Sequence, residues 1–215
     1  MKKSIFAAQW FLENNHTFNP NSLDGHLKVQ KLLYYAQAMS LVGLGEPLFD
    51  EKIEAWENGP VVPDVYKVYR HHNLPVVTTV LGSQYTFEKK QEQLLKIVDY
   101  VYGNMCSDEL VNQTHSEDPW KDLEHLALIR CNPEITIESM RKYYIHLSEI
   151  YEAYKDYDFD SEVVESINGV RFAYNRHETV LEQNDIEILQ QISSNSNNCD
   201  SYFVYKDDNG ELVVY

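Results

Sequence analysis

The sequence predicts a mainly α-helical protein with a small α+β extension at its C-terminal end. Two observations predict this. Up to about residue 157, apolar side chains repeat three and four positions apart, which is the spacing of one face of an α-helix. Beyond that point the chain has short β-prone runs, and Asn209-Gly210 between two of them is a strong hairpin signal. We therefore divide the chain into a compact multi-helix domain, residues 1–157, and an accessory extension, residues 158–215.

Charge restricts the classes of protein that this chain could be. It carries 34 acidic and 18 basic residues, for a net charge of −16, and it has no dense run of lysine or arginine. Nucleic-acid-binding proteins usually present a basic stripe, so we expect no direct contact with nucleic acid. An acidic surface instead suits solubility or the attraction of a basic protein partner.

The chain lacks the marks of an exported or membrane protein. Gln9 interrupts the first apolar run and Glu13 ends it, without a cleavage site of small residues, so we interpret it as a helix rather than a signal peptide. No run approaches the roughly 18 apolar residues of a membrane span. The 3 cysteines are widely spaced, without a CxxC pair, which is typical of a reducing compartment. We expect a cytoplasmic protein without a membrane partner.

The first two helices follow from apolar spacing. Residues 4–15 carry apolar side chains on one face. The second helix begins near Leu27 and is apolar on nearly all sides, which predicts a helix buried in the core. Glycine accepts the left-handed backbone of a C-cap, so Gly43 and Gly45 predict where this helix ends.

A stiff corner follows this helix. The segment from Pro47 to Trp56 supplies apolar anchors to the core. In Gly59–Pro63, two prolines fix two backbone angles and remove two hydrogen-bond donors, which predicts a specific turn. Asp64 is expected to cap the next helix.

Further helices are expected along the rest of the helical domain. Residues 76–87 read as a short hairpin or an extended segment. The later helices are predicted from apolar spacing and from residues that cap helix N-termini. They are Glu88–Met105, a short helix from Ser107 to Gln113, a helix opened by a capping box at Thr114–Glu117 or by Asp118-Pro119, and a long helix capped by Thr136.

The extension begins with a change in composition. Alternating acidic residues between Asp156 and Glu165 indicate a linker. Beyond it the sequence predicts a strand at Val170–Tyr174, a short helix capped by Asn184 or Asp185, a polar spacer at 193–198 and the terminal hairpin.

No motif supports catalysis, a cofactor or a metal. HExxH, GxxxxGK[ST] and GxGxxG are all absent, and the adjacent histidines 71 and 72 diverge on a helix. We therefore predict no enzyme, no cofactor and no metal. One alternative stays open, which is an enzyme that uses His115 with Glu117.

Four segments together resemble the Panacea domain family, which includes the SocA-like antitoxins. The segments are Lys28–Gln37 (KVQKLLYYAQ), Pro47–Trp56 (PLFDEKIEAW), Gly59–Tyr66 (GPVVPDVY) and Leu110–Trp120 (LVNQTHSEDPW). The first departs from the family's pattern only at Val29, and the resemblance covers roughly residues 1–150. It implies a mostly helical domain that neutralises a cognate protein toxin by direct contact, alone or in a homo-oligomer or a hetero-oligomer with the toxin. It also implies an alternative, an adaptor that delivers the toxin to an ATP-dependent protease.

Residues in and directly beside these segments are candidates for partner contact. Tyrosine and tryptophan give large contact area with a polar tip, which suits protein interfaces, although the same residues also serve as core residues with hydrogen-bonded tips. Lysines on the second helix either pair with Glu54 or Glu57 or meet an acidic partner. The candidates are Lys28, Lys31, Tyr34, Tyr35, Trp56, Asn58, Tyr66, Tyr69, Thr114 and His115. The extension is expected to tune partner choice.

Overall fold

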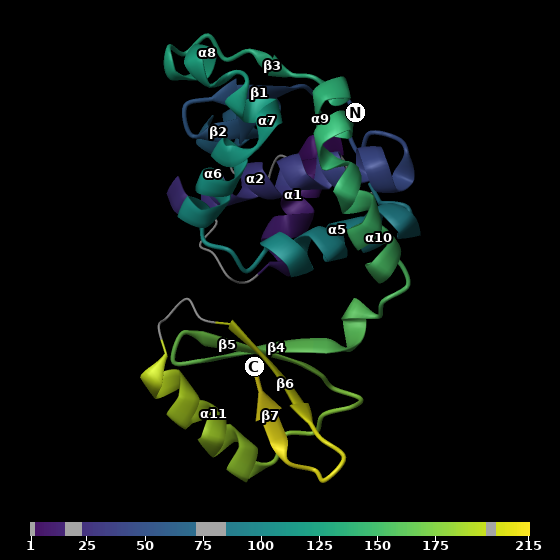
Figure 1. Cartoon of the computed structure of the whole chain (residues 1–215), viewed down its shortest axis with the longest axis vertical. Coiled ribbons are helices and arrows are strands. Elements are labelled where there is room, and N and C mark those ends of the chain that lie inside the picture. Colours follow the sequence, from purple (N-terminus) through teal and green to yellow (C-terminus); the bar gives the residue numbers. More distant parts are fainter. Residues whose placement is uncertain (1–2, 16–22, 72–84, 197–200) are drawn as a thin grey trace. The chain divides into compact units, whose positions relative to one another are not determined.

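The computed structural model describes residues 3–15, 23–71, 85–196 and 201–215. The chain divides into two compact units, Met1–Asp156 and Tyr157–Tyr215. Helices dominate the first unit, and the second combines a helix with a four-stranded sheet (Figure 1). The predicted fold class, mainly α with an α+β extension, is confirmed.

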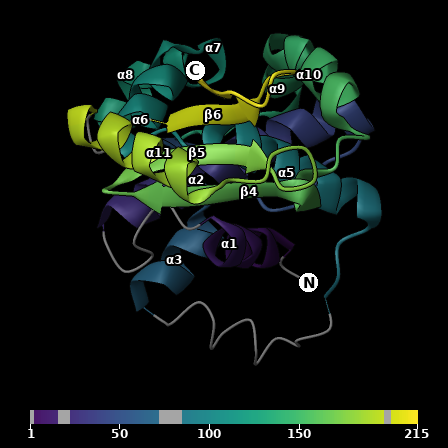
Figure 2. The same ribbon diagram turned by 90° about the horizontal axis from the view of Figure 1, so that it is seen from below.

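The helices of the first unit surround one central helix. That helix is α2, which packs against α1, α5, α6 and α10 (Figures 1 and 2). The helices described in this unit are α1 (Lys3–Asn14), α2 (Leu23–Met39), η1 (a π-turn, Ser40–Leu44), α3 (Pro63–His71), α5 (Lys89–Tyr102), α6 (Ser107–Ser116), α7 (Asp118–Lys121), α8 (Glu124–Leu128), α9 (Ile137–Tyr143), η2 (a 3-10 turn, Tyr144–His146) and α10 (Leu147–Tyr154).

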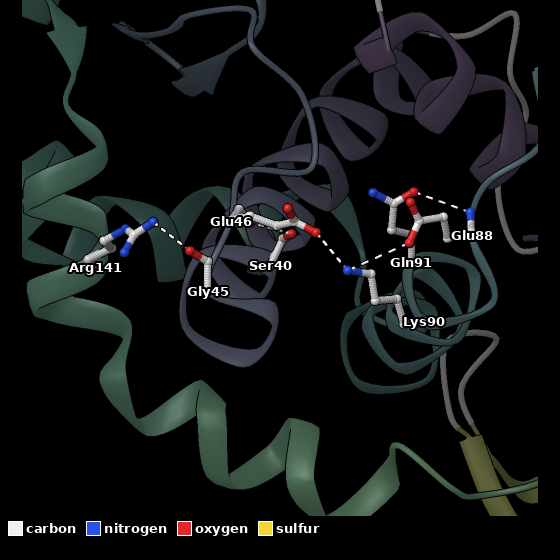
Figure 3. Close-up of polar contacts among 7 residues, drawn as sticks. All are labelled: Ser40, Gly45, Glu46, Glu88, Lys90, Gln91 and Arg141. Carbon is white, nitrogen blue, oxygen red and sulfur yellow. Dashed lines mark hydrogen bonds and ion pairs between the residues drawn. The ribbon is translucent and has the colours of Figure 1, made fainter.

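The central helix is buried on all sides, as its apolar residues predict. Every residue from Lys28 to Leu41 is buried. The helix continues through the π-turn η1 and ends at Gly45, whose left-handed backbone (φ 78°) forms the predicted C-cap. Figure 3 shows how neighbouring helices hold this end: Arg141 donates to the carbonyl of Gly45 (2.9 Å), and Lys90 pairs with Glu46 (2.8 Å).

A small antiparallel sheet in this unit was not predicted. Its strands are β1 (Ile53–Trp56), β2 (Gly59–Val61) and β3 (Glu134–Ile135), in the order β2-β1-β3. Strands of two to four residues are too short to show an alternating pattern, and β3 comes from a distant part of the chain. The stiff corner is therefore a hairpin, with Trp56 paired to Gly59. Helix α3 begins at Pro63, so Asp64 lies in its first turn and is not its cap.

Three other local predictions can be compared with the structure. Of the two starts expected for the helix after α6, Asp118-Pro119 is the observed one, because α7 begins at Asp118 with proline in its first turn and Glu117 as its N-cap. Thr114 lies inside α6 and opens no helix, and its hydroxyl contacts the carbonyls of Leu110 and Val111 (both 3.0 Å). The predicted long helix is divided by η2 into α9 and α10. Thr136 does cap α9, accepting from the Ser139 amide. Most of the segment expected as a hairpin, 76–87, lies outside the described residues.

The second unit is a helix packed on a sheet. The strands run in the order β4-β5-β6-β7, antiparallel except for the parallel pair β5 and β6, which α11 connects. Figures 1 and 2 show α11 beside the strands. The elements are η3 (Phe159–Ser161), β4 (Glu162–Ile167), β5 (Val170–Asn175), α11 (Gln183–Asn195), β6 (Ser201–Lys206) and β7 (Leu212–Val214).

The core of this unit lies between α11 and one face of the sheet. Val170, Phe172, Leu189 and Val204 are its buried residues. Residues 162–165, expected in the linker, belong to β4, and 193–195, expected in the spacer, end α11. Residues 197 and 198 of that spacer lie outside the described residues. The predicted strand after residue 170 and the terminal hairpin are confirmed.

Candidate partner-binding surface

A lysine of α2 is enclosed within the helical unit. The side chain of Lys31 is fully buried, and its Nζ donates to the carbonyl of Pro60 (3.1 Å). Burial lowers the pKa of Lys31 to about 7, because an apolar environment disfavours the charged form. Gly59 lies directly over this side chain with φ 95°, and a Cβ there would approach Lys31 Cε and Nζ to 2.7 Å. The turn between β1 and β2 therefore needs glycine at this position.

Two glutamines of α2 hold the neighbouring backbone. The side-chain oxygen of Gln30 accepts from the Val62 amide (2.8 Å). Two helical turns further along α2, Gln37 accepts from the amides of Leu48 (3.0 Å) and Phe49 (3.2 Å) and donates to the Phe49 carbonyl (3.0 Å). Buried backbone groups must find hydrogen-bond partners, and here side chains of α2 supply them. The central helix thus positions the segment that leads into the hairpin and the segment that leaves it.

A stacked pair of rings supports the hairpin from α6 and α7. The indole of Trp120 is buried and donates to the carbonyl of Trp56 (2.9 Å). The ring of His115 stacks on Trp120, with centroids 3.7 Å apart and planes 10° apart. Burial and then the charge of Lys31 lower the pKa of His115, so its imidazole is neutral at pH 7. His115 Nε2 is buried and has no hydrogen-bond partner within the described part of the chain.

A buried carboxyl group gathers the core tyrosines. Glu117 accepts from the hydroxyls of Tyr35 (3.1 Å to each oxygen) and Tyr144. The hydroxyl oxygens of Tyr144 and Tyr34 lie 3.2 Å apart, within hydrogen-bond distance, and Tyr102 stacks on Tyr35 with centroids 4.0 Å apart. Burial raises the pKa of Glu117 above its usual range, although the tyrosine hydroxyls oppose this. The cluster therefore joins α2, α5 and η2 at the junction between α6 and α7, and the hydroxyls of Tyr34, Tyr35 and Tyr144 are all hydrogen-bonded within it.

Aromatic and arginine side chains lie on the outside of the hairpin. The rings of Trp56 and Tyr66 meet edge to face with centroids 4.8 Å apart, and both are half-buried. Arg70 donates to the hydroxyl of Tyr66 (2.9 Å). At the tip of the hairpin Asn58 is exposed. We name Trp56, Asn58, Tyr66 and Arg70 the corner surface. Tryptophan, tyrosine and arginine are the residues that most often dominate the energy of protein interfaces.

The structure separates the predicted partner residues into two groups. Five of them are buried: Lys28, Lys31, Tyr34, Tyr35 and Thr114. Asn58 is exposed, and the remaining residues are half-buried: Trp56, Tyr66, Tyr69 and His115. Partner contact stays a prediction for both groups, and the second group is the more accessible one.

The lysines of α2 were expected to pair with glutamates or to meet a partner. For Lys31, the structure instead shows the hydrogen bond to Pro60 described above. Glu54 pairs with Lys52, and Glu57 pairs with Arg130 (3.2 Å).

The residues that sequence reasoning missed are buried polar ones. Glu117 was predicted as part of a capping box or as a catalytic partner of His115, yet its hydrogen bonds run to tyrosines, and the described contacts include none to His115. Gln30 and Gln37 are seven positions apart on α2, which places them near one line along the helix. That spacing, in an otherwise apolar helix, was the available signal.

The described part of the chain has neither a membrane-spanning helix nor a cluster of metal-binding side chains. No helix there is both long and apolar enough to cross a membrane. No group of three or more His, Cys, Asp or Glu side chains in those ranges is arranged to hold a metal ion.

Comparison with known proteins agrees with the resemblance seen in the motifs. Residues 29–121 match the family described as "Antitoxin SocA-like, Panacea domain". The Antitoxin SocA of Caulobacter vibrioides (strain NA1000 / CB15N) is 30% identical over 107 residues. That alignment covers 44% of this chain and 57% of the relative, so the chain spans little more than half of the relative's length. No solved structure matches the chain significantly. The predicted family resemblance is confirmed over residues 29–121, which lie within the helical unit, and the second unit lies outside the family match.

Proposed function

We propose that this chain is an antitoxin that binds a cognate protein toxin and holds it inactive in the cytoplasm. The observation that carries the proposal is the family match over residues 29–121, which contains the hairpin and the residues of α2, α6 and α7 that contact it. The matched relative is itself an antitoxin. The proposal needs neither a cofactor nor catalysis.

The corner surface is suited to binding because buried side chains hydrogen-bond to the backbone of the hairpin that carries it. Lys31 and Gln30 hold the second strand of the hairpin, and Trp120 holds the end of the first. A surface that is ordered before binding loses little conformational entropy when the partner arrives. We infer that the toxin contacts Trp56, Tyr66 and Asn58, and that this contact covers the toxin's active or substrate site.

The experiment that tests this function is a growth assay with co-purification. The gene next to this one in the native operon is expressed from an inducible promoter, with and without the full chain. We expect growth arrest that the chain relieves, together with a stable complex of the two proteins. An adjacent gene that is not toxic, or a toxic one that the chain neither relieves nor binds, would contradict the proposal.

Surface variants connect the assay to the structure. Asn58→Arg places a long charged side chain at the exposed tip of the hairpin, so we expect it to weaken the complex at least tenfold without changing the melting temperature. The matched control is Lys67→Ala, an exposed residue of α3 next to Tyr66, which should rescue growth fully. Equal rescue by both variants would remove the corner surface from the proposal. Toxin abundance, followed by immunoblot, shows whether the toxin is held or degraded.

A further inference from the structure

The sheet of the second unit has one face that α11 covers and one that it does not. Side chains alternate between the two faces of a strand, so the residues next to each core residue point the other way. On β6, Val204 is buried in the core, whereas its neighbours Phe203 and Tyr205 are 36% and 45% exposed. We call the face that carries Phe203 and Tyr205 the outer face.

Apolar residues cross the outer face as a continuous row. The register pairs Val164 on β4 with Ala173 on β5, and Ala173 with Phe203 on β6. Phe203 and Tyr215 exchange two backbone hydrogen bonds (2.9 and 3.1 Å), which extends the row beyond β7. The row therefore crosses β4, β5 and β6 and ends at Tyr215, directly after β7. Val164 and Tyr215 at its two ends are 53% and 68% exposed.

The aromatic rings of this face lie against one another. Phe203 and Tyr215 have ring centroids 5.8 Å apart, and Tyr205 meets Tyr215 at 5.9 Å. On one side, the row is bordered by a polar row in which Arg171 donates to the hydroxyl of Ser201 (3.0 Å). An apolar patch with a polar border is the usual composition of a protein-binding surface.

Charge decides which partner fits. Residues 157–215 carry 12 acidic and 3 basic residues, for a net charge of −9, within a chain of net charge −16. Two copies of this unit would bring like charges together, which opposes self-association. A partner segment with apolar side chains could pack on the row, and flanking lysine or arginine residues would be attracted by the negative charge of the unit.

We propose that the outer face is a docking surface for a basic, apolar segment of the toxin. The inference rests on the proposed antitoxin function and adds a second contact to it, outside the family match. The family-like helical unit would supply the common framework, and the outer face would select the particular toxin.

The test measures binding of the full-length chain to the purified product of the adjacent gene, at low and moderate salt. Tyr215→Ala removes the most exposed ring, and Val164→Lys places a positive charge at the other end of the row. We expect each to weaken binding at least tenfold, and the wild-type association rate to fall as salt rises. The matched control is Ile188→Lys on α11, where an apolar residue 37% exposed lies on a different element of the same unit. It should change affinity less than twofold.

The outcomes separate this inference from the proposed function. If the wild-type chain binds and rescues growth while all three variants bind equally well, the outer face is not the docking surface and the antitoxin function stands. If the wild-type chain neither binds nor rescues, both are overturned. If Tyr215→Ala or Val164→Lys instead lowers the sedimentation mass or the melting temperature and leaves toxin affinity unchanged, the face packs on a second copy or on the helical unit, and the inference fails.

Discussion

Single buried polar side chains determine much of this architecture. Lys31 is the clearest case, because burying an amine is unfavourable and the side chain has one hydrogen-bond partner, the Pro60 carbonyl, in the described part of the chain. Its burial has a consequence for stability. Between pH 7 and about 10, the unfolded chain holds a proton on this amine that the folded chain has released. The free energy of unfolding therefore rises with pH over this range.

Lys31→Met tests this linkage. We expect the free energy of unfolding of the wild-type chain to rise, relative to that of the variant, by about 1.4 kcal/mol for each pH unit between pH 7 and about 9.5. Urea unfolding at several pH values measures the difference. Lys67→Met, at an exposed position of α3, is the control and should keep a constant difference from the wild type. A constant difference for Lys31→Met as well would mean that its amine is hydrated and charged in the folded protein.

The buried carboxyl group of Glu117 changes the free energy of unfolding with pH in the opposite direction to Lys31. Burial raises the pKa of its carboxyl group, so the folded chain keeps a proton that the unfolded chain has lost. Its contribution to stability is fully present below the usual carboxyl pKa and is lost as pH rises through the folded value.

At the scale of elements, the hairpin of β1 and β2 depends on contacts with α2 more than on its own pairing. The register joins only three residue pairs, and a hairpin this short is not stable alone. Gly59 allows the hairpin to lie close to Lys31 for two reasons. Its backbone has a positive φ, and the Lys31 side chain occupies the space that a Cβ would need. Gly45 has a similar φ but open space around it. Substitution at Gly45 would therefore cost only backbone strain, whereas substitution at Gly59 would cost backbone strain and a steric clash.

Gly59→Ala and Gly45→Ala form a matched pair. Both should destabilise by about 1–3 kcal/mol, because alanine is strained at positive φ. Gly59→Ala should cost more, because its Cβ would also clash with Lys31 Cε and Nζ and approach Thr114 Oγ1 to 3.0 Å. Chemical denaturation of the two variants gives the difference. Equal losses would show that the Lys31 side chain moves aside without cost.

At the scale of the whole molecule, two units with separate cores lie in one chain. The core of the second unit, around Phe172 and Leu189, is complete within residues 157–215. The central helix and the tyrosine cluster around Glu117 lie within the first unit. Each unit therefore contains the contacts that stabilise it, although the functional division between them stays a prediction.

A truncated chain of residues 1–156 tests this independence. We expect it to unfold in one cooperative transition, with a helical circular dichroism spectrum and a melting temperature within a few degrees of the helical transition of the full chain. It should also keep the corner surface. A truncated chain that melts without cooperativity would show that the helical unit needs residues 157–215.

Local pattern by itself determined the principal helices, the left-handed end at Gly45, the cap at Thr136 and the terminal hairpin. Each of these depends on residues close together in the chain, so spacing and turn chemistry were enough. The motifs likewise predicted the Panacea resemblance before any geometry was known. The same reasoning failed at Thr114, where the local capping pattern is overridden by the continuation of α6.

Only the tertiary structure decided which polar residues face inward. Sequence alone left Tyr34 and Tyr35 as either core or partner residues, and their burial depends on Glu117 and Tyr144, which lie far away along the chain. The small sheet needs β3, about eighty residues after β1, and the outer face needs the register of four strands. These features come from contacts between distant segments, and a periodic pattern within one segment carries no information about such contacts.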